Sequence, residues 1–121
     1  AVVWITHDLG IIAGLAERVA VMHGGYIIEE GPVKQIYGNP QHPYTVGLLG
    51  SLPRLDASGK KRLVSIEGLP PVLYKKPNYC PFAPRCAYRV ERCLHENPEL
   101  TVVGDGQRAA CWVDVKSGRE R

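Results

Sequence analysis

The hydrophobic pattern at the start of the chain predicts a buried strand followed by a helix. Residues 2–5 are all apolar, and the run ends abruptly at Thr6, His7 and Asp8. Because the run does not alternate with polar residues, it is typical of a strand buried on both faces, as in a parallel sheet. Apolar residues then recur at helical spacing over residues 9–18, and Asp8 can cap this helix. His7 is therefore expected at the carboxyl end of a strand, where open parallel sheets bind ligands.

The next apolar segments predict a β-hairpin. Residues 19–22 and 26–31 flank a turn that contains Gly24. A polar residue in such a turn needs no special role, so none is assigned to His23. A short helical turn is expected next, over residues 33–37, because a proline precedes it.

Changes in composition divide the chain into three regions. Residues 1–38 contain too few apolar elements to bury their own core, and we expect them to expose apolar surface. Residues 39–61 contain a helix and end in a polar linker over residues 56–61. Residues 62–121 begin with an alternating strand over residues 62–71, which two prolines end. This third region has few large apolar residues and many prolines, so it needs a cross-linking centre for stability.

The helix of the second region is expected to begin after Pro43 and to end at Pro53. Its buried face would be formed by Tyr44, Leu48, Leu49 and Leu52. His42 and Tyr44 are interpreted as residues that cap this helix or pack over the core, rather than as ligand contacts.

All four cysteines lie in the third region, with the spacing C-x5-C-x6-C-x17-C. They are Cys80, Cys86, Cys93 and Cys111. Structural zinc sites favour cysteine pairs separated by two to four residues, so this spacing does not indicate zinc. Iron–sulfur clusters also use four thiolates and have more varied spacing. Two disulfides or four free thiols are further alternatives, although a reducing cytosol disfavours disulfides. Nearby aromatic residues are expected to pack around the centre: Tyr79, Phe82, Tyr88 and Trp112.

The order of strand, Thr-His-Asp motif, helix and hairpin resembles the C-terminal end of the ATP-binding subunit of ABC transporters. Residues 29–49, EEGPVKQIYGNPQHPYTVGLL, are similar to the tail of the oligopeptide and dipeptide importers in that superfamily. The resemblance covers essentially the whole chain. It implies an α/β fold: the C-terminal end of a RecA-like ABC ATPase sheet over residues 1–38, followed by the His-Pro-Tyr helix. A small, irregular, cysteine-rich α+β module would then occupy residues 62–121.

The resemblance implies a role for His7 as the switch histidine that contacts the terminal phosphate of ATP. An imidazole can donate to a phosphate oxygen and report whether that phosphate is present, so His7 is interpreted as a sensor and organiser rather than a general base. The chain contains no GxxxxGK[ST] phosphate loop. We therefore expect a fragment that neither binds ATP tightly nor hydrolyses it alone, while the complete protein uses ATP and magnesium.

The same resemblance implies partners and a possible metal centre. The partners would be a second ATPase subunit, identical or paralogous, and the membrane subunits of the transporter. The location would be cytoplasmic, at the inner face of the cell membrane. In some members of the family the matching segment ligates an iron–sulfur cluster, which Cys80, Cys86, Cys93 and Cys111 would then hold, with zinc as the alternative. A second hypothesis is an interaction or regulatory module that such a centre stabilises and that has no catalytic role.

Composition narrows the function classes further. The 121 residues carry a net charge of +3, from 15 basic and 12 acidic residues, which is too mild to indicate nucleic-acid binding. No apolar run approaches the roughly 20 residues that a membrane-spanning helix needs. We therefore expect neither a nucleic-acid partner nor a direct membrane span.

Overall fold

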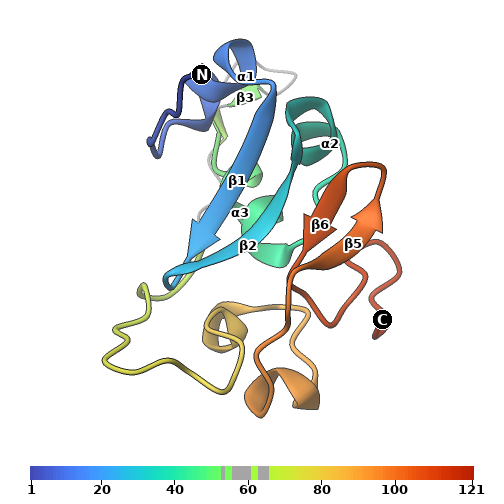
Figure 1. The fold of residues 1–121 in the computed structure, drawn as a ribbon. Coiled ribbons are helices and arrows are strands. Elements are labelled where there is room, and N and C mark those ends of the chain that lie inside the picture. Colours follow the sequence, from blue (N-terminus) through green and yellow to red (C-terminus); the bar gives the residue numbers. More distant parts are fainter. Residues whose placement is uncertain (53, 56–60, 63–65) are drawn as a thin grey trace.

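The computed structural model describes residues 1–52, 54–55, 61–62 and 66–121. It forms an antiparallel sheet with short helices beside it (Figure 1). In chain order the elements are α1 (Leu9–Leu15), β1 (Arg18–His23), β2 (Tyr26–Pro32), α2 (Val33–Gly38), α3 (Pro43–Gly50), β3 (Arg54–Leu55), β4 (Lys61–Arg62), the 3₁₀ helices η1 (Ala83–Arg85) and η2 (Glu91–Leu94), β5 (Thr101–Gly104) and β6 (Gln107–Ala109). The described part of the chain is thus a small α/β unit.

The main sheet joins the two ends of the sequence. Its four strands have the order β1-β2-β6-β5, and all neighbouring pairs are antiparallel. The β1–β2 hairpin turns at Gly24 and Gly25, whose positive φ angles of 58° and 82° suit a tight hairpin turn. The predicted hairpin is therefore confirmed. Strand β6 comes from the cysteine-rich region, where no strand was predicted beyond residue 71, and it pairs with β2 through Glu29 and Glu30.

The core lies between the hairpin and the helices that follow it. Val21, Ile28 and Ile36 form its buried centre, and Ile36 is completely inaccessible. Tyr44 and Leu48 of α3 pack against this centre, as predicted for the buried face of that helix. The predicted helical turn over residues 33–37 is also present, as α2.

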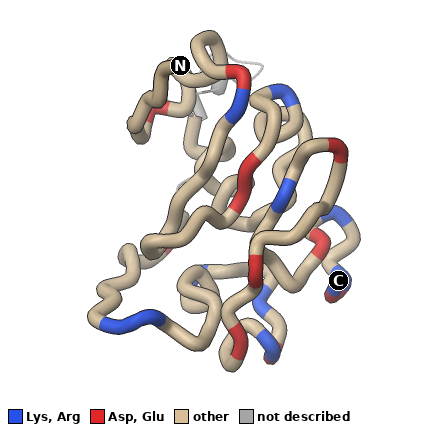
Figure 2. Tube along the Cα trace, viewed as in Figure 1, with Lys and Arg blue, Asp and Glu red and all other residues tan. Residues whose placement is uncertain are grey.

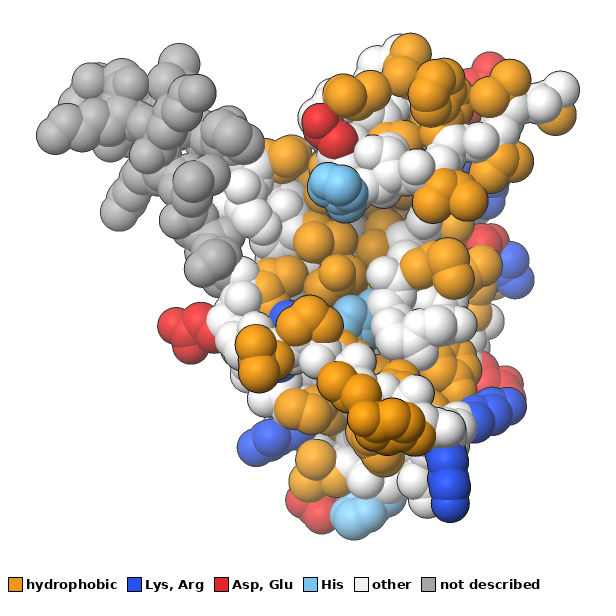
Figure 3. Space-filling view, turned by 90° about the vertical axis from the view of Figure 1, so that its left-hand side faces the viewer, with side chains coloured by type: hydrophobic (Ala, Val, Ile, Leu, Met, Phe, Trp, Pro, Cys, Tyr) orange, Lys and Arg blue, Asp and Glu red, His pale blue; other side chains and the backbone are white. Residues whose placement is uncertain are grey.

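The predicted strand at residues 2–5 is wrong. Residues 1–8 form no helix or strand, and Val3 and Ile5 are 87% and 96% exposed. A strand buried on both faces needs paired neighbours, and the described part of the chain places none beside this segment. The expectation of exposed apolar surface in the first region is confirmed, and hydrophobic side chains cover much of the face drawn in Figure 3.

Three other predicted boundaries differ from the structure. The first helix ends at Leu15 rather than at residue 18, because the chain turns there into β1. The strand predicted over residues 62–71 is wrong from residue 66 onward, where Gly68 has φ +91° and two prolines follow, which breaks a β-ladder. The rest of that strand (63–65) and most of the predicted linker (56–60) lie outside the described residues. The helix of the second region ends at Gly50, with Ser51 as its C-cap, before the predicted end at Pro53.

None of the helices in the described ranges is long and apolar enough to cross a membrane.

Candidate functional site

A buried carboxylate, that of Glu29, connects the three regions of the chain. Glu29 is fully inaccessible, and its Oε1 accepts from the backbone N–H of Gln41 at 2.7 Å and from Nε2 of Gln107 at 2.8 Å. Its Oε2 accepts from the backbone N–H of His42 at 3.0 Å. Gln107 also donates to the carbonyl of Asn39 at 2.9 Å. These bonds hold the segment before α3 against β2 and β6.

The neighbouring Glu30 has a different environment on the same strand. Its side chain is paired with the guanidinium of Arg108 on β6 at the surface. Figure 2 shows the acidic positions of β2 beside the basic position of β6. The two adjacent glutamates thus make a buried connection and an exposed one between the same pair of strands.

His42 caps α3, as the sequence predicted. Its Nδ1 accepts from the backbone N–H of Tyr44 at 3.0 Å, and its side chain is 2% exposed. Burial, together with the nearby His23 and Arg121, lowers the pKa of His42 to about 3. The imidazole is therefore neutral at physiological pH, which leaves the Nδ1 lone pair free to act as the cap.

An aromatic cluster packs around this cap. The ring of Phe82 lies 5.9 Å from that of His42, 5.4 Å from that of Tyr44 and 5.5 Å from that of His23. His23 and Tyr44 are closer still, at 4.4 Å between ring centroids. Phe82 belongs to the loop between the first two cysteines, so the cluster joins the cysteine-rich region to α3 and the hairpin.

The four cysteines line one small cavity of about 10 Å³. The wall also includes Phe82, Tyr88 and Trp112, three of the four aromatic residues predicted to surround the centre. The backbone N–H of Cys80 donates to the carbonyl of Cys93 at 2.9 Å, which holds these two segments together. All four cysteines are free thiols.

The thiols have an apolar environment. Burial raises the pKa of Cys86 to about 12 and that of Cys111 to about 11, and it also raises the pKa of Cys80. The cysteines lie near enough to disfavour one another's ionisation, which adds to the rise for Cys86. Within the described ranges, no three His, Cys, Asp or Glu side chains are arranged to hold a metal ion.

His7 lies far from this cavity in the sequence, in the exposed segment before α1. Oδ1 of the next residue, Asp8, accepts from the backbone N–H groups of Gly10 at 3.0 Å and Ile11 at 3.2 Å, so the predicted cap is confirmed. The imidazole of His7 makes no hydrogen bond to any described residue. The structure therefore does not bring His7 and the cysteines together.

Three buried polar residues of this site carried no clear signal in the sequence. Glu29 and Gln107 are 78 residues apart, and nothing local indicates that they meet. His23 stands beside a hairpin turn, yet it is only 6% exposed because η1 and the cysteine loop cover it. The one available hint was Glu29 itself, a charged residue inside a strand predicted to be apolar. A charge that becomes buried needs hydrogen-bonding partners.

These features make the chain a small α/β unit. Its His-Pro-Tyr helix is capped, packs against an antiparallel sheet and lies beside a cavity lined by cysteines. A family model for the C-terminal region of oligopeptide/dipeptide transporters matches residues 28–93, which include most of the hairpin's second strand, α2, α3 and three of the cysteines. The chain belongs to this family, as its resemblance predicted.

Similar proteins carry matching names. The chain is 49% identical over 113 residues to the dipeptide transport ATP-binding protein DppD of Bacillus subtilis, which covers 93% of this chain and 33% of that protein. It is 43% identical over 116 residues to the oligopeptide transport ATP-binding protein OppD of Haemophilus influenzae, and the match covers 96% of this chain and 35% of that protein. It is 50% identical over 107 residues to the oligopeptide transport ATP-binding protein OppD of Mycobacterium tuberculosis, and the match covers 88% of this chain and 18% of that protein. The chain thus spans about a third or less of the length of these relatives.

Proposed function

We propose that this chain is the C-terminal part of the ATPase subunit of an ABC importer for peptides. The family match over residues 28–93 carries the proposal, because it includes the whole His-Pro-Tyr helix and its anchor to β2. The names of the relatives, dipeptide and oligopeptide transport ATP-binding proteins, support the same assignment. The exposed apolar residues at 2–5 agree with it, since a larger ATPase domain would cover them.

His7 is the residue we assign to nucleotide sensing. It lies at the entrance to α1, on a turn that the Asp8 cap holds in place, and its imidazole has no partner among the described residues. From such a position the imidazole can donate one hydrogen bond to the terminal phosphate of ATP bound by the rest of the subunit. ATP and magnesium belong to that complete protein, and residues 1–121 alone are expected to show no turnover.

A substitution in the complete subunit tests this assignment. His7→Ala should lower ATP hydrolysis about a hundredfold, the usual effect of removing one preorganised donor, and should leave ATP binding nearly unchanged. His95→Ala is the matched control, since His95 is an exposed histidine whose partner among the described residues is Glu91. Full ATPase activity in the His7→Ala protein would refute the role of His7, and loss of activity in both variants would point to a general defect.

The proposed partners follow from the same assignment. They are a second ATPase subunit, identical or paralogous, and the membrane subunits of the transporter, so the protein would work at the inner face of the cell membrane in the cytoplasm. Co-purification of the complete subunit with its membrane subunits, and ATP-dependent dimerisation, are the measurements that test this arrangement.

A second proposal concerns Cys80, Cys86, Cys93 and Cys111, and one observation favours it: all four line a single cavity. Four thiols on one apolar-walled site have the ligand chemistry of an iron–sulfur cluster, or alternatively of zinc. Either centre would require the thiols to lose the protons that burial now stabilises, and it would rearrange the loops that carry them. Its contribution would be structural, because it would cross-link a region with a small core.

Anaerobic purification tests the cysteine centre directly. Iron, zinc, acid-labile sulfide and free thiol are measured on one sample, together with its absorption spectrum. Iron and sulfide in similar amounts, with a charge-transfer band, support the cluster, and stoichiometric zinc supports the alternative. Four free thiols without metal would refute both. If the centre is present and the complete subunit shows no ATP-dependent dimerisation, the alternative role as a stabilised interaction module gains the stronger support.

A further inference from the structure

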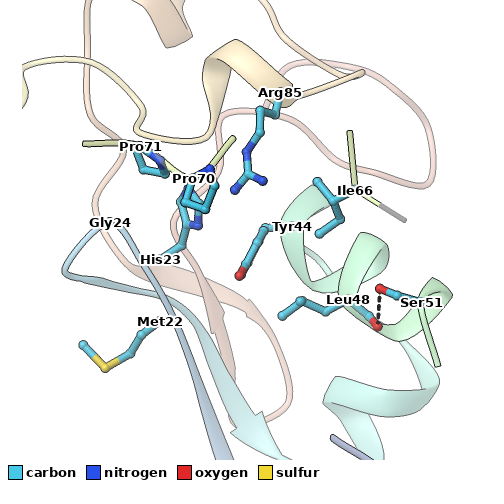
Figure 4. Close-up of a pocket in the computed structure, with 10 residues that line it drawn as sticks. All are labelled: Met22, His23, Gly24, Tyr44, Leu48, Ser51, Ile66, Pro70, Pro71 and Arg85. Carbon is cyan, nitrogen blue, oxygen red and sulfur yellow. Dashed lines mark hydrogen bonds between the residues drawn. The ribbon is translucent and has the colours of Figure 1, made fainter. Parts of the chain in front are cut away.

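A second cavity, separate from the cysteines, lies where the three regions meet. Its volume is about 470 Å³, which is within the range of small-molecule sites. The end of β1, Tyr44 and Leu48 of α3, residues 66–71 and Arg85 of η1 line it (Figure 4). It shares no lining residue with the cysteine cavity, and Phe82 packs between the two.

The walls of this cavity are held by close packing. A Cβ atom at Gly47 of α3 would lie 2.6 Å from Cγ1 of Ile66, and one at Gly68 would lie 2.9 Å from Cδ of Arg85. Residues 66–71 therefore pass directly over both α3 and η1. Most of the lining is apolar, with Met22, Leu48 and the two prolines 70 and 71 among its members.

His23 lines this cavity and carries a buried ring nitrogen that has no partner among the described residues. The side chain is 6% exposed, and the nitrogen without a hydrogen-bond partner is Nε2. Burial and the charge of Arg85 lower the pKa of His23, so the ring is neutral, while a hydrogen bond to the Pro81 carbonyl acts in the opposite direction. With the ring proton on Nδ1, toward that carbonyl, Nε2 would be the acceptor and would take a donor from a ligand.

Arg85 supplies a positive charge to the same cavity. Its guanidinium lies 5.5 Å from the ring centroid of Phe82 and 6.0 Å from that of Tyr44, and Figure 4 shows it pointing toward Tyr44 and His23. It makes no ion pair with any carboxylate of the described residues. Stacking on two aromatic rings holds the planar guanidinium in place, with donors left for a carboxylate.

We propose that this cavity binds the C-terminal residue of a short peptide or an N-acylated amino acid with an apolar side chain. The carboxylate pairs with Arg85, and the amide N–H of the same residue donates to Nε2 of His23. The apolar side chain lies against Met22, Leu48 and Ile66. One C-terminal residue of this kind carries all three groups: the carboxylate, the amide N–H and the apolar side chain. The proposal does not depend on the transport role or on a cysteine centre.

Three small probes on the ¹⁵N-labelled 121-residue chain test the proposal by NMR titration. N-acetyl-L-leucine should bind with a Kd of about 1 mM and shift the amides of Gly24, Ser51 and Ile66. N-acetyl-L-leucinamide lacks the carboxylate, and 4-methylpentanoate lacks the N–H. Each should bind about tenfold more weakly, because each leaves one polar group unpaired.

Two arginine variants locate the contact. Arg85→Gln should weaken binding of N-acetyl-L-leucine about tenfold, whereas Arg89→Gln, an exposed neighbour outside the cavity, should leave it unchanged. The spectrum of each free variant shows whether it is folded, and the comparison of the three probes needs no variant at all. Equal binding of the acid and the amide, shifts at other residues, or no shifts at ten times the expected Kd would overturn the proposal.

Discussion

Replacing Glu29 by glutamine tests whether its buried carboxylate holds the unit together. Glutamine has nearly the same shape, so the change removes charge without creating a cavity. Its one oxygen can still accept from Gln41 and Gln107, at the cost of the charge assistance in both bonds. Its NH₂ group would face the backbone N–H of His42, which leaves that N–H and the NH₂ group itself without an acceptor at this contact.

The expected loss follows from these three bonds. An unsatisfied buried donor costs about 1–3 kcal/mol, and each bond that becomes neutral loses about 1 kcal/mol. Part of this loss is offset, because the neutral glutamine avoids the desolvation penalty of a buried carboxylate. We therefore expect Glu29→Gln to lower the free energy of unfolding by about 3 kcal/mol.

Glu30→Gln is the matched control, because it makes the same chemical change one residue away in an exposed pair. Surface ion pairs contribute about 0–1 kcal/mol, so its effect should be small. Urea unfolding of the 121-residue chain, followed by tryptophan fluorescence and circular dichroism, measures both variants. If Glu29→Gln destabilises the chain by no more than Glu30→Gln does, the network is not the anchor that its geometry indicates.

Three further predictions concern groups elsewhere in the unit. Burial lowers the pKa of His42 from 6.5 to about 3, so between these pH values the unfolded chain binds a proton at His42 that the folded chain does not. The free energy of unfolding should therefore fall by about 1.4 kcal/mol per pH unit as the pH drops from about 6.5 towards 3. Urea midpoints across this pH range should show a shallower slope in His42→Asn, which keeps a capping acceptor, and an unchanged one in His95→Asn. The raised pKa of Cys86 should make its thiol slow to react with iodoacetamide in metal-free folded protein at pH 7, and the rate should increase strongly in urea; equal rates in both states would contradict its burial. Tyr37→Phe removes the hydrogen bond from the hydroxyl to the Leu9 carbonyl and should lower unfolding free energy by about 1 kcal/mol, with hydrogen exchange increasing first in α1; no change in either measurement would refute this contact.

Local signals in the sequence were sufficient to predict the structural features that depend on residues close together in the chain. The Asp8 cap, the hairpin at Gly24 and the helix after Pro43 with its His42 cap all appear in the structure as predicted. Each depends on backbone preferences and side-chain hydrogen bonds within a few residues, which the sequence pattern contains directly. The motif around the His-Pro-Tyr helix was also enough to indicate the family, because it is a contiguous stretch.

Contacts between distant residues were decided by the tertiary structure alone. The pairing of β6 with β2, and the bond between Gln107 and Glu29, join positions 78 to 80 residues apart. His23 becomes buried only because Phe82 folds over the hairpin. The apolar run at 2–5, by contrast, has a strand pattern and no strand, because pairing requires a neighbour that no local pattern can supply. The sequence by itself determined caps, turns and helix starts; burial, sheet order and the shape of both cavities depended on which distant segments meet.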